Sequence, residues 1–358
     1  MLGRGVDQIL PHPGDPALRE SHMHDARGYL DLAAAVNGAI PRPVDWAWPW
    51  GDALESLDAA RCDARIVNLE TSITTSSDFA RGKGVHYRMN PANHPALTVV
   101  RPDVCVLANN HVLDFGNRGL LETLDVLSSV DLRAAGAGRS AGEAEAPAVV
   151  RTPRTEGRVI VFSFGTPSSG IPVNWAATSG GPGVHLLPKL SDSQADHLCQ
   201  RARRMRQLGD VVIASVHWGS NWGYHIELDQ VRFAHRLIDG GFDLVHGHSS
   251  HHPRPLEVYR RKLILYGCGD LIDDYEGIRG YEQYRDDLRL LYLARLEQTS
   301  GRLLDLRMVP LQARQLRLHR ASTDDANWLR TVLDNVSRPF GTQIELDSDQ
   351  QLNIAARR

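Results

Sequence analysis

Apolar runs that end abruptly in polar side chains constrain this chain more than any other feature. The clearest run spans residues 104–108 and is followed directly by Asn109, Asn110 and His111, with Asp114 three residues further on. A buried strand with this ending delivers an amide, an imidazole and a carboxylate to its carboxyl end. Ligands in open α/β sheets bind at that end of the strands. The sequence therefore predicts an α/β fold with a site where its strands end.

Helical and strand-like segments alternate along most of the chain. Apolar spacing predicts helices over residues 21–37, 53–60, 91–100, 116–130, 191–206 and 229–238, and one near Trp328. Strands are predicted over residues 65–69, 103–108, 158–164, 211–216, 242–245, 262–266, 288–296 and 303–310. This alternation is typical of a layered α/β fold, and the hairpin-like later strands indicate a mixed sheet.

Composition excludes several classes of function. The 358 residues are 42% hydrophobic and 23% charged, as in an ordinary globular protein. The 40 basic and 43 acidic residues give a net charge of -3 without a basic block, so no nucleic-acid partner is expected. No run approaches the ~20 apolar residues of a membrane span, and no signal pattern opens the chain, which predicts a cytoplasmic protein. The four cysteines lack C-x-x-C spacing, which argues against a cysteine-based zinc site.

Three further apolar runs end in the same kind of residue. They deliver Asn68 and Glu70, then Ser215 and His217, and finally His246, His248, His251 and His252. Imidazole nitrogens together with carboxylate and amide oxygens suit Zn²⁺, Mn²⁺ or Fe²⁺ better than Ca²⁺ or Mg²⁺. Each element alone has a structural alternative, such as a hydrogen-bonded core histidine or an amide that caps a turn. Their joint occurrence favours a metal site.

The motifs match one family in order. N-L-E, A-N-N-H-x-x-D-x-G, S-x-H-W-G, G-H-x-x-H with P-x-P-x-E-V-Y, and G-C-G-D follow one another along the chain. This set resembles the poly-γ-glutamate capsule biosynthesis (CapA-type) proteins of the calcineurin-like metallophosphoesterase superfamily, over roughly residues 1–280. The resemblance implies a four-layer α/β/β/α sandwich of two mixed sheets. We expect one such domain over residues 1–312 and a C-terminal helical extension, residues 313–358, packed on it.

The resemblance also implies two divalent transition-metal ions (Mn, Fe or Zn) at one end of the paired sheets. Their expected ligands are Glu70, Asn110, His217, His248 and His251. The spacing G-H-S-S-H-H leaves Ser250, His251 and His252 open for the last position. The family opens with Gly-Asp directly before a segment like residues 1–4, and that aspartate is a metal ligand. It is absent from this sequence, so either residues precede Met1 in the native chain or one metal position is weakened.

Two residues of the opening motif are candidates for proton transfer. The resemblance places His111 against the leaving group or the attacked centre. The spacing of three residues lets Asp114 orient the imidazole and hold it protonated. We expect substrate contacts from Arg4, Asn68, Trp218, Asn221 and His252. Core packing is an equal alternative for Trp218 and Trp222. Arg254 is a second candidate for an anionic substrate, and Asp270 for a group behind the metal ligands.

These residues predict a metal-dependent hydrolase of the metallophosphoesterase type. Two ions would activate a water, whose pKa falls towards ~7, for attack on a phosphoester or amide-like bond. The substrate is expected to be an anionic small molecule or polymer, and an oligomer is compatible with the sequence. The alternative is a non-hydrolytic subunit of poly-γ-glutamate capsule synthesis. A third, weaker hypothesis is a biosynthetic enzyme that uses the same site on a small metabolite.

Overall fold

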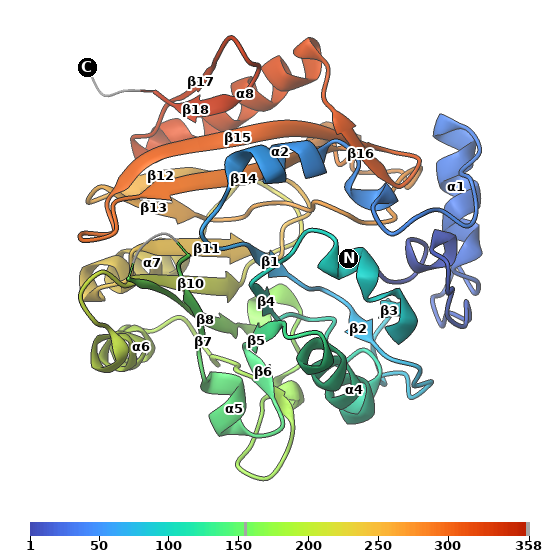
Figure 1. Ribbon diagram of the computed structural model, residues 1–358, viewed down its shortest axis with the longest axis horizontal. Coiled ribbons are helices and arrows are strands. Elements are labelled where there is room, and N and C mark those ends of the chain that lie inside the picture. Colours follow the sequence, from blue (N-terminus) through green and yellow to red (C-terminus); the bar gives the residue numbers. More distant parts are fainter. Residues whose placement is uncertain (154–155, 356–358) are drawn as a thin grey trace.

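The strand that carries the opening motif is the middle strand of a three-stranded parallel sheet. The computed structural model describes residues 1–153 and 156–355 (Figure 1). In it, β4 (Val104–Val106) pairs with β1 (Ile66–Asn68) on one side and β5 (Arg133–Ala135) on the other. Because the strands are parallel, the carboxyl ends of β1 and β4 lie side by side.

A six-stranded sheet carries the histidine motifs. Its order is β12-β13-β11-β10-β8-β7, and its bounds are Ala148–Arg151 (β7), Arg158–Gly165 (β8), Val211–His217 (β10), Leu244–His248 (β11), Leu256–Tyr259 (β12) and Lys262–Leu265 (β13). The four central strands are parallel, and the two edge strands are antiparallel. His217 is the register partner of His248, so both motifs end at the same edge.

A third sheet has the order β14-β15-β18-β17, with β16 paired to β15, and two-stranded sheets join β2 to β3 and β6 to β9. Its bounds are Leu288–Leu296 (β14), Leu303–Arg314 (β15), Arg317–Arg320 (β16), Ile344–Leu346 (β17) and Leu352–Ile354 (β18). Side chains from β4 and from β14 and β15 form a single apolar cluster with β8, β10, β11 and β13. Both smaller sheets therefore pack on the same face of the six-stranded sheet.

Helices cover the two outer faces. On the six-stranded sheet lie α6 (Asp192–Met205) and α7 (Leu228–Gly240). The side chain of Ser191 accepts a hydrogen bond from Gln194 N and caps α6, and the helix buries Ala195, Leu198, Cys199 and Ala202 at helical spacing. The opposite face is covered by α1 (Arg27–Asn37), α2 (Ala53–Ala60), α3 (Pro95–Thr98) and α4 (Gly116–Ser129). In residues 1–153 and 156–355, no helix is long and apolar enough to cross a membrane.

This layering confirms the predicted α/β/β/α sandwich and refines it in one respect. The layer opposite the six-stranded sheet consists of two separate hydrogen-bonded sheets, one with β1-β4-β5 and one built on β14 and β15. Short elements complete the chain: β2 (Ser72–Ile73), β3 (Arg88–Met89), β6 (Ala137–Gly138), α5 (Ala141–Glu145) and β9 (Gly183–Val184).

The predicted helical extension over residues 313–358 needs correction. The expected helix around Trp328 is present as α8 (Thr323–Ser337), but the proposed boundary falls inside β15. The same region supplies β16, β17 and β18, and β18 joins the sheet through β15. Strands of three or four residues are too short to show alternation in a sequence. Residues 356–358 lie outside the described part of the chain.

Candidate functional site

The carboxyl ends of β1, β4, β10 and β11 meet at one place, as predicted from the polar residues that follow them. The His217 Nε2 atom lies 3.8 Å from the Glu70 Oε1 atom, which joins the two sheets. The Nδ1 atoms of His217 and His248 are 2.7 Å apart. His111 follows β4 and is close enough to His217 to influence its pKa.

Glu70 is buried and held by an amide relay. The Asn68 side chain donates to the Glu70 Oε2 atom at 2.8 Å and accepts from the Asn109 side chain at 3.0 Å. Burial raises the pKa of Glu70 to about 7, although the positive charge of His251 opposes this rise. A carboxylate that lacks sufficient positive charge around it is suited to accept a cation.

Two buried polar atoms, one at the end of β10 and one just after β4, have no hydrogen bond to any described residue. They are the Nε2 atom of His217 and the Oδ1 atom of Asn110. Burial lowers the pKa of His217 well below its ordinary value, so the ring is neutral and keeps a lone pair. Unpaired buried polar atoms are costly, and a divalent ion with nitrogen and oxygen ligands would satisfy both. Glu70 and His217, which lie 3.8 Å apart, therefore fit a metal position, and Asn110 follows β4 at the same end of the two sheets.

His248, another expected ligand, is less well placed to bind a metal. The His248 Nε2 atom lies 3.0 Å from the Ser215 hydroxyl, and its Nδ1 atom faces His217, so both ring nitrogens are engaged. Among the described residues there is no group of three or more His, Cys, Asp and Glu side chains that could hold a metal ion. In this arrangement His248 orients His217 rather than presenting a donor of its own.

Of the three candidates for the last ligand, His251 faces the site. Its Nδ1 atom lies 2.8 Å from Asp270 and its Nε2 atom 3.5 Å from the Tyr275 hydroxyl. A carboxylate on Nδ1 is a common arrangement behind a metal-binding histidine. Burial opposes a charge on this ring, but Asp270 outweighs it and raises the pKa of His251. His251 must therefore lose a proton before it can bind a metal.

Ser250 and His252 are engaged elsewhere. The Ser250 hydroxyl donates to the carbonyl of His252 at 2.9 Å. The two ring nitrogens of His252 lie 3.0 Å from the Pro253 carbonyl and 3.0 Å from the Gly223 amide. The expected substrate contact from His252 is therefore wrong, because backbone groups of the adjoining loops occupy both of its nitrogens.

His111, Asp114 and Lys83 form a buried group at the end of β4. The His111 Nδ1 atom lies 2.7 Å from the Asp114 Oδ2 atom and 2.9 Å from the Lys83 ammonium. Lys83 also donates to Asp114 Oδ1 and to the carbonyl of Asn110. Burial lowers the pKa of His111 to about 4, with Asp114 opposing and Lys83 adding to this effect. The predicted protonated state is therefore wrong: burial keeps the imidazole neutral, while Asp114 does orient it.

Sequence reasoning missed Lys83. It lies in a Gly-Lys-Gly loop that matches none of the motifs, and it reaches the site only because β3 pairs with β2 and brings the loop back. The only feature of the sequence that could have indicated Lys83 is its position between two glycines.

Replacement of Lys83 by methionine is expected to raise the pKa of His111 by about one unit or more, because it removes a positive charge 2.9 Å from the ring. An NMR titration of the histidine ring protons measures this shift. Lys189→Met, which changes an exposed lysine, is the control and should leave His111 unchanged. An unaltered His111 titration in the Lys83 variant would show that the ammonium does not act on the ring.

Arg4 is not available to a substrate. Its side chain donates to Asp274 at 2.8 Å and to Glu20 at 2.9 Å, and it stacks 3.7 Å from the Tyr29 ring centroid. Only 2% of its side chain is exposed. The expectation that Arg4 binds an anionic substrate is wrong, because its guanidinium is already paired with the carboxylates of Asp274 and Glu20.

Two other side chains predicted to contact substrate, those of Trp218 and Arg254, are occupied by contacts within the protein. Trp218 is 1% exposed, and its indole donates to the Tyr266 carbonyl at 2.9 Å, so the core-packing alternative holds. The Arg254 guanidinium donates hydrogen bonds to the carbonyl groups of residues 220, 222 and 225. Asn221 is exposed beside the site, and its carbonyl accepts from His251 N at 3.0 Å.

Aromatic residues form a wall next to His251. Trp222 lies 5.3 Å from the His251 ring and stacks on Tyr281 at 3.9 Å between centroids. Tyr284 packs against Trp222 and stacks on His252. The wall joins two loops that are distant in sequence, which is why Tyr281 and Tyr284 were not found from motifs.

Comparisons with known proteins identify the family that the motifs resemble. A family model described as "Bacterial capsule synthesis protein PGA_cap" matches residues 1–275. The chain is 52% identical over 356 residues to a probable polyglutamine synthesis accessory protein of Mycobacterium tuberculosis (strain ATCC 25618 / H37Rv), a match that covers 99% of this chain and 93% of the relative. It is 26% identical over 226 residues to the PGA biosynthesis protein CapA of Bacillus subtilis (strain 168), which covers 63% of this chain and 56% of the relative.

Solved structures are more distant. A 5'-nucleotidase precursor from Thermus thermophilus shares 15% identity with a TM-score of 0.40, over 70% of this chain and 45% of that chain. A likeness at this TM-score carries no weight for fold or function. The family match over most of the chain and the identity with the mycobacterial relative are decisive for membership. The chain belongs to the PGA_cap family of bacterial capsule synthesis proteins.

Proposed function

We propose that this protein is a metal-dependent hydrolase whose metal is held by Glu70, His217 and Asn110. The observation that supports this most strongly is the unpartnered, buried His217 Nε2 atom 3.8 Å from the buried Glu70 carboxylate, with a second unpartnered atom, Asn110 Oδ1, just after β4. When bound, a divalent ion in such a site supplies a Lewis acid and an activated water at neutral pH. His251 would join as a ligand only after it loses a proton. His248 would join only after its ring reorients.

We assign proton transfer to His111, supported by Asp114 and Lys83. Since Asp114 faces the His111 Nδ1 atom at 2.7 Å, a neutral ring can donate there and keep Nε2 as an acceptor. His111 would therefore first take a proton from the attacking water, and the imidazolium formed could then give that proton to the leaving group. Asp114 positions the ring. Burial would raise the pKa of Asp114, but His111 and Lys83 together outweigh burial and lower this pKa, so the carboxylate stays ionised.

The relatives and the aromatic wall beside His251 support a substrate class. The relatives are named for polyglutamine synthesis and PGA biosynthesis, which supports an anionic polymer or its precursor as the substrate. Trp222 and Tyr281 offer stacked ring surfaces for its backbone amides or apolar segments. The bond cleaved would be a phosphoester or an amide-like bond.

A non-hydrolytic role in capsule polymer synthesis is the second candidate. Two observations favour it: both ring nitrogens of His248 are engaged, and His251 is paired with Asp270. The mycobacterial relative is described as an accessory protein, which fits a subunit that binds the polymer without cleaving it.

Metal analysis combined with a hydrolysis assay separates the two candidates. The purified chain is reconstituted with Mn²⁺, Fe²⁺ or Zn²⁺, dialysed, and assayed on bis-p-nitrophenyl phosphate and on a γ-glutamyl anilide. The hydrolase proposal predicts retained metal and metal-dependent turnover of one substrate. Retained metal without turnover of either would favour the accessory role, and a chain that retains no metal would contradict the metal site itself.

A further inference from the structure

Asn109 is a fully buried side chain whose four hydrogen bonds join the segments that follow β1 and β4. Its amide nitrogen donates to the Leu69 carbonyl at 2.9 Å and to the side-chain oxygen of Asn68 at 3.0 Å. Its side-chain oxygen accepts from the backbone amides of His111 and Val112, each at 3.1 Å. One side chain therefore grips both strand ends at the place where the site begins.

The backbone fixes which way round the Asn109 amide lies. The Leu69 carbonyl can only accept a hydrogen bond, and the backbone amides of His111 and Val112 can only donate one. The side-chain nitrogen of Asn109 must therefore face Leu69, and its oxygen must face the two backbone amides. The second proton of that nitrogen then points to Asn68.

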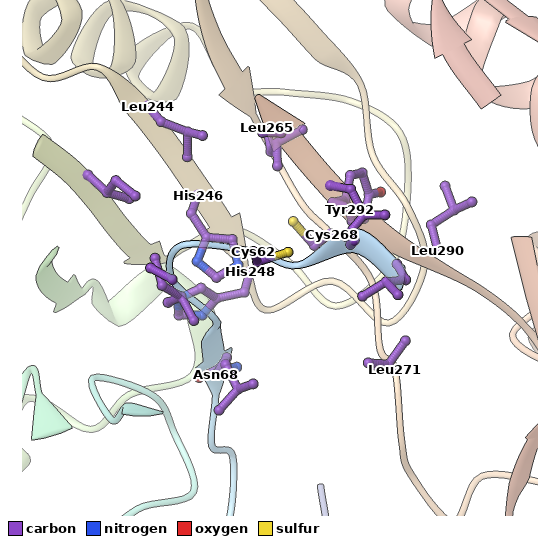
Figure 2. A pocket seen from close by; sticks show the side chains of 18 of the residues that line it. Cys62, Asn68, Leu244, His246, His248, Leu265, Cys268, Leu271, Leu290 and Tyr292 are labelled. Carbon is purple, nitrogen blue, oxygen red and sulfur yellow. The ribbon is translucent and has the colours of Figure 1, made fainter. Parts of the chain in front are cut away.

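The orientation of Asn109 determines the orientation of Asn68. Because Asn109 presents a donor, Asn68 turns its oxygen towards Asn109 and its nitrogen towards the Glu70 Oε2 atom. Burial does not hold Asn68 in place, since this side chain is half-buried and borders a cavity of about 920 Å³ (Figure 2). A reversed Asn68 amide would put its oxygen against the Glu70 carboxylate, which can only accept hydrogen bonds when it is ionised.

Asn109 also shapes the turn that carries His111. An asparagine oxygen that accepts from backbone amides two and three residues further on forms an Asx turn. On the other side of this turn, the Ser72 hydroxyl donates to the carbonyls of His111 and Val112 at 3.1 and 3.0 Å. The backbone of His111 is therefore fixed before Asp114 orients its ring.

We propose that Asn109 is a positioning residue that couples Glu70 to His111. The roles of these two side chains in catalysis rest on the proposed function, whereas the coupling can be measured without metal. Through Asn68, Asn109 keeps a hydrogen-bond donor on the Glu70 carboxylate, and through the turn it holds His111 at the end of β4. Loss of a hydrogen-bond partner behind a metal ligand typically weakens metal binding by about 10- to 100-fold.

Hydrogen exchange followed by NMR in ¹⁵N-labelled, metal-free protein tests the coupling. Asn109→Ala is expected to speed exchange of the Asn68 side-chain amide protons, and of the His111 and Val112 backbone amides, by about 10-fold or more. Asn109→Ser is expected to speed exchange at Asn68 equally but to leave the two backbone amides protected. A serine hydroxyl supports the same turn, but it is too short to reach Asn68.

Asn93→Ala is the matched control. Asn93 is also a fully buried asparagine, and its side chain donates to Asp7 at 2.7 Å and to the His12 carbonyl at 2.9 Å. Its replacement should cost stability without changing exchange at Asn68. In calorimetric titrations with Mn²⁺, Asn109→Ala and Asn68→Ala should each weaken binding by about 10-fold or more, and Asn93→Ala should not.

Three results would overturn the proposal. Unchanged exchange of the Asn68 side-chain amide in both Asn109 variants would show that Asn109 does not orient Asn68. Equally fast exchange at Asn68 in the Asn93 variant would assign the effect to a general loss of stability. Mn²⁺ affinity that falls in Asn68→Ala but not in Asn109→Ala would show that the effect does not pass through Asn109. A wild-type chain that binds no Mn²⁺ would instead contradict the proposed metal site, and the exchange measurements would still decide on the coupling.

Discussion

Replacement of Arg4 by methionine is expected to lower the free energy of unfolding by about 3–5 kcal/mol. The substitution leaves Asp274, whose side chain has no exposed surface, without its cation, and it removes the partner of Glu20. Breaking one side of a buried ion pair strands a charge in a medium that solvates it poorly. Urea denaturation followed by circular dichroism measures the change.

The control for this prediction is Arg27→Met. Arg27 also pairs with an aspartate, Asp25, but 59% and 43% of their side chains are exposed, so little change is expected. The double variant Arg4→Met with Asp274→Leu should recover part of the loss, because it removes both charges. A stable Arg4→Met variant with a raised KM would instead support the role in substrate binding that we have rejected.

Replacement of His217 by alanine is expected to weaken metal binding and to reduce hydrolysis by about 100-fold or more. The Nε2 atom of this ring has no hydrogen-bond partner and lies 3.8 Å from Glu70 Oε1, so the substitution removes a proposed metal ligand. Calorimetric titration with Mn²⁺ and the phosphodiester assay measure the two effects.

His185→Ala is the matched control for this second prediction. His185 is equally a buried histidine, with a pKa lowered to about 4 by burial, but its ring faces the Ser163 carbonyl and the charges of Glu145 and Arg201. Its replacement should cost stability without changing metal affinity. Equal metal affinity in the His217 variant and the wild-type chain would remove His217 from the site.

Short motifs at strand ends predicted the location of the site because strand direction alone decides where such residues meet. The polar residues after 104–108 and 211–216 identified β4 and β10. Parallel pairing aligned each strand with a neighbour, β4 with β1 and β10 with β11, and packing of the two sheets brought these ends together. The strand predicted over residues 288–296 is β14, with the same bounds that the structure shows. These features depend on local sequence and on general rules of sheet geometry.

Side-chain partners could not be predicted in the same way. Arg4 pairs with Asp274 and Lys83 with Asp114, and only the folded chain brings these residues together. His251 and His252 are adjacent, yet one faces the site while the other binds backbone of a neighbouring loop. The charge state of His111 depends on burial and on Lys83, neither of which can be read from a spacing of three residues.

Anomalous X-ray scattering from crystals grown with Mn²⁺ tests the central claim most directly, because it locates the ion without relying on activity. A manganese peak is expected within coordination distance of Glu70, His217 Nε2 and Asn110 Oδ1. Full occupancy of these three atoms by hydrogen bonds to water or protein, with no peak beside them, would contradict it.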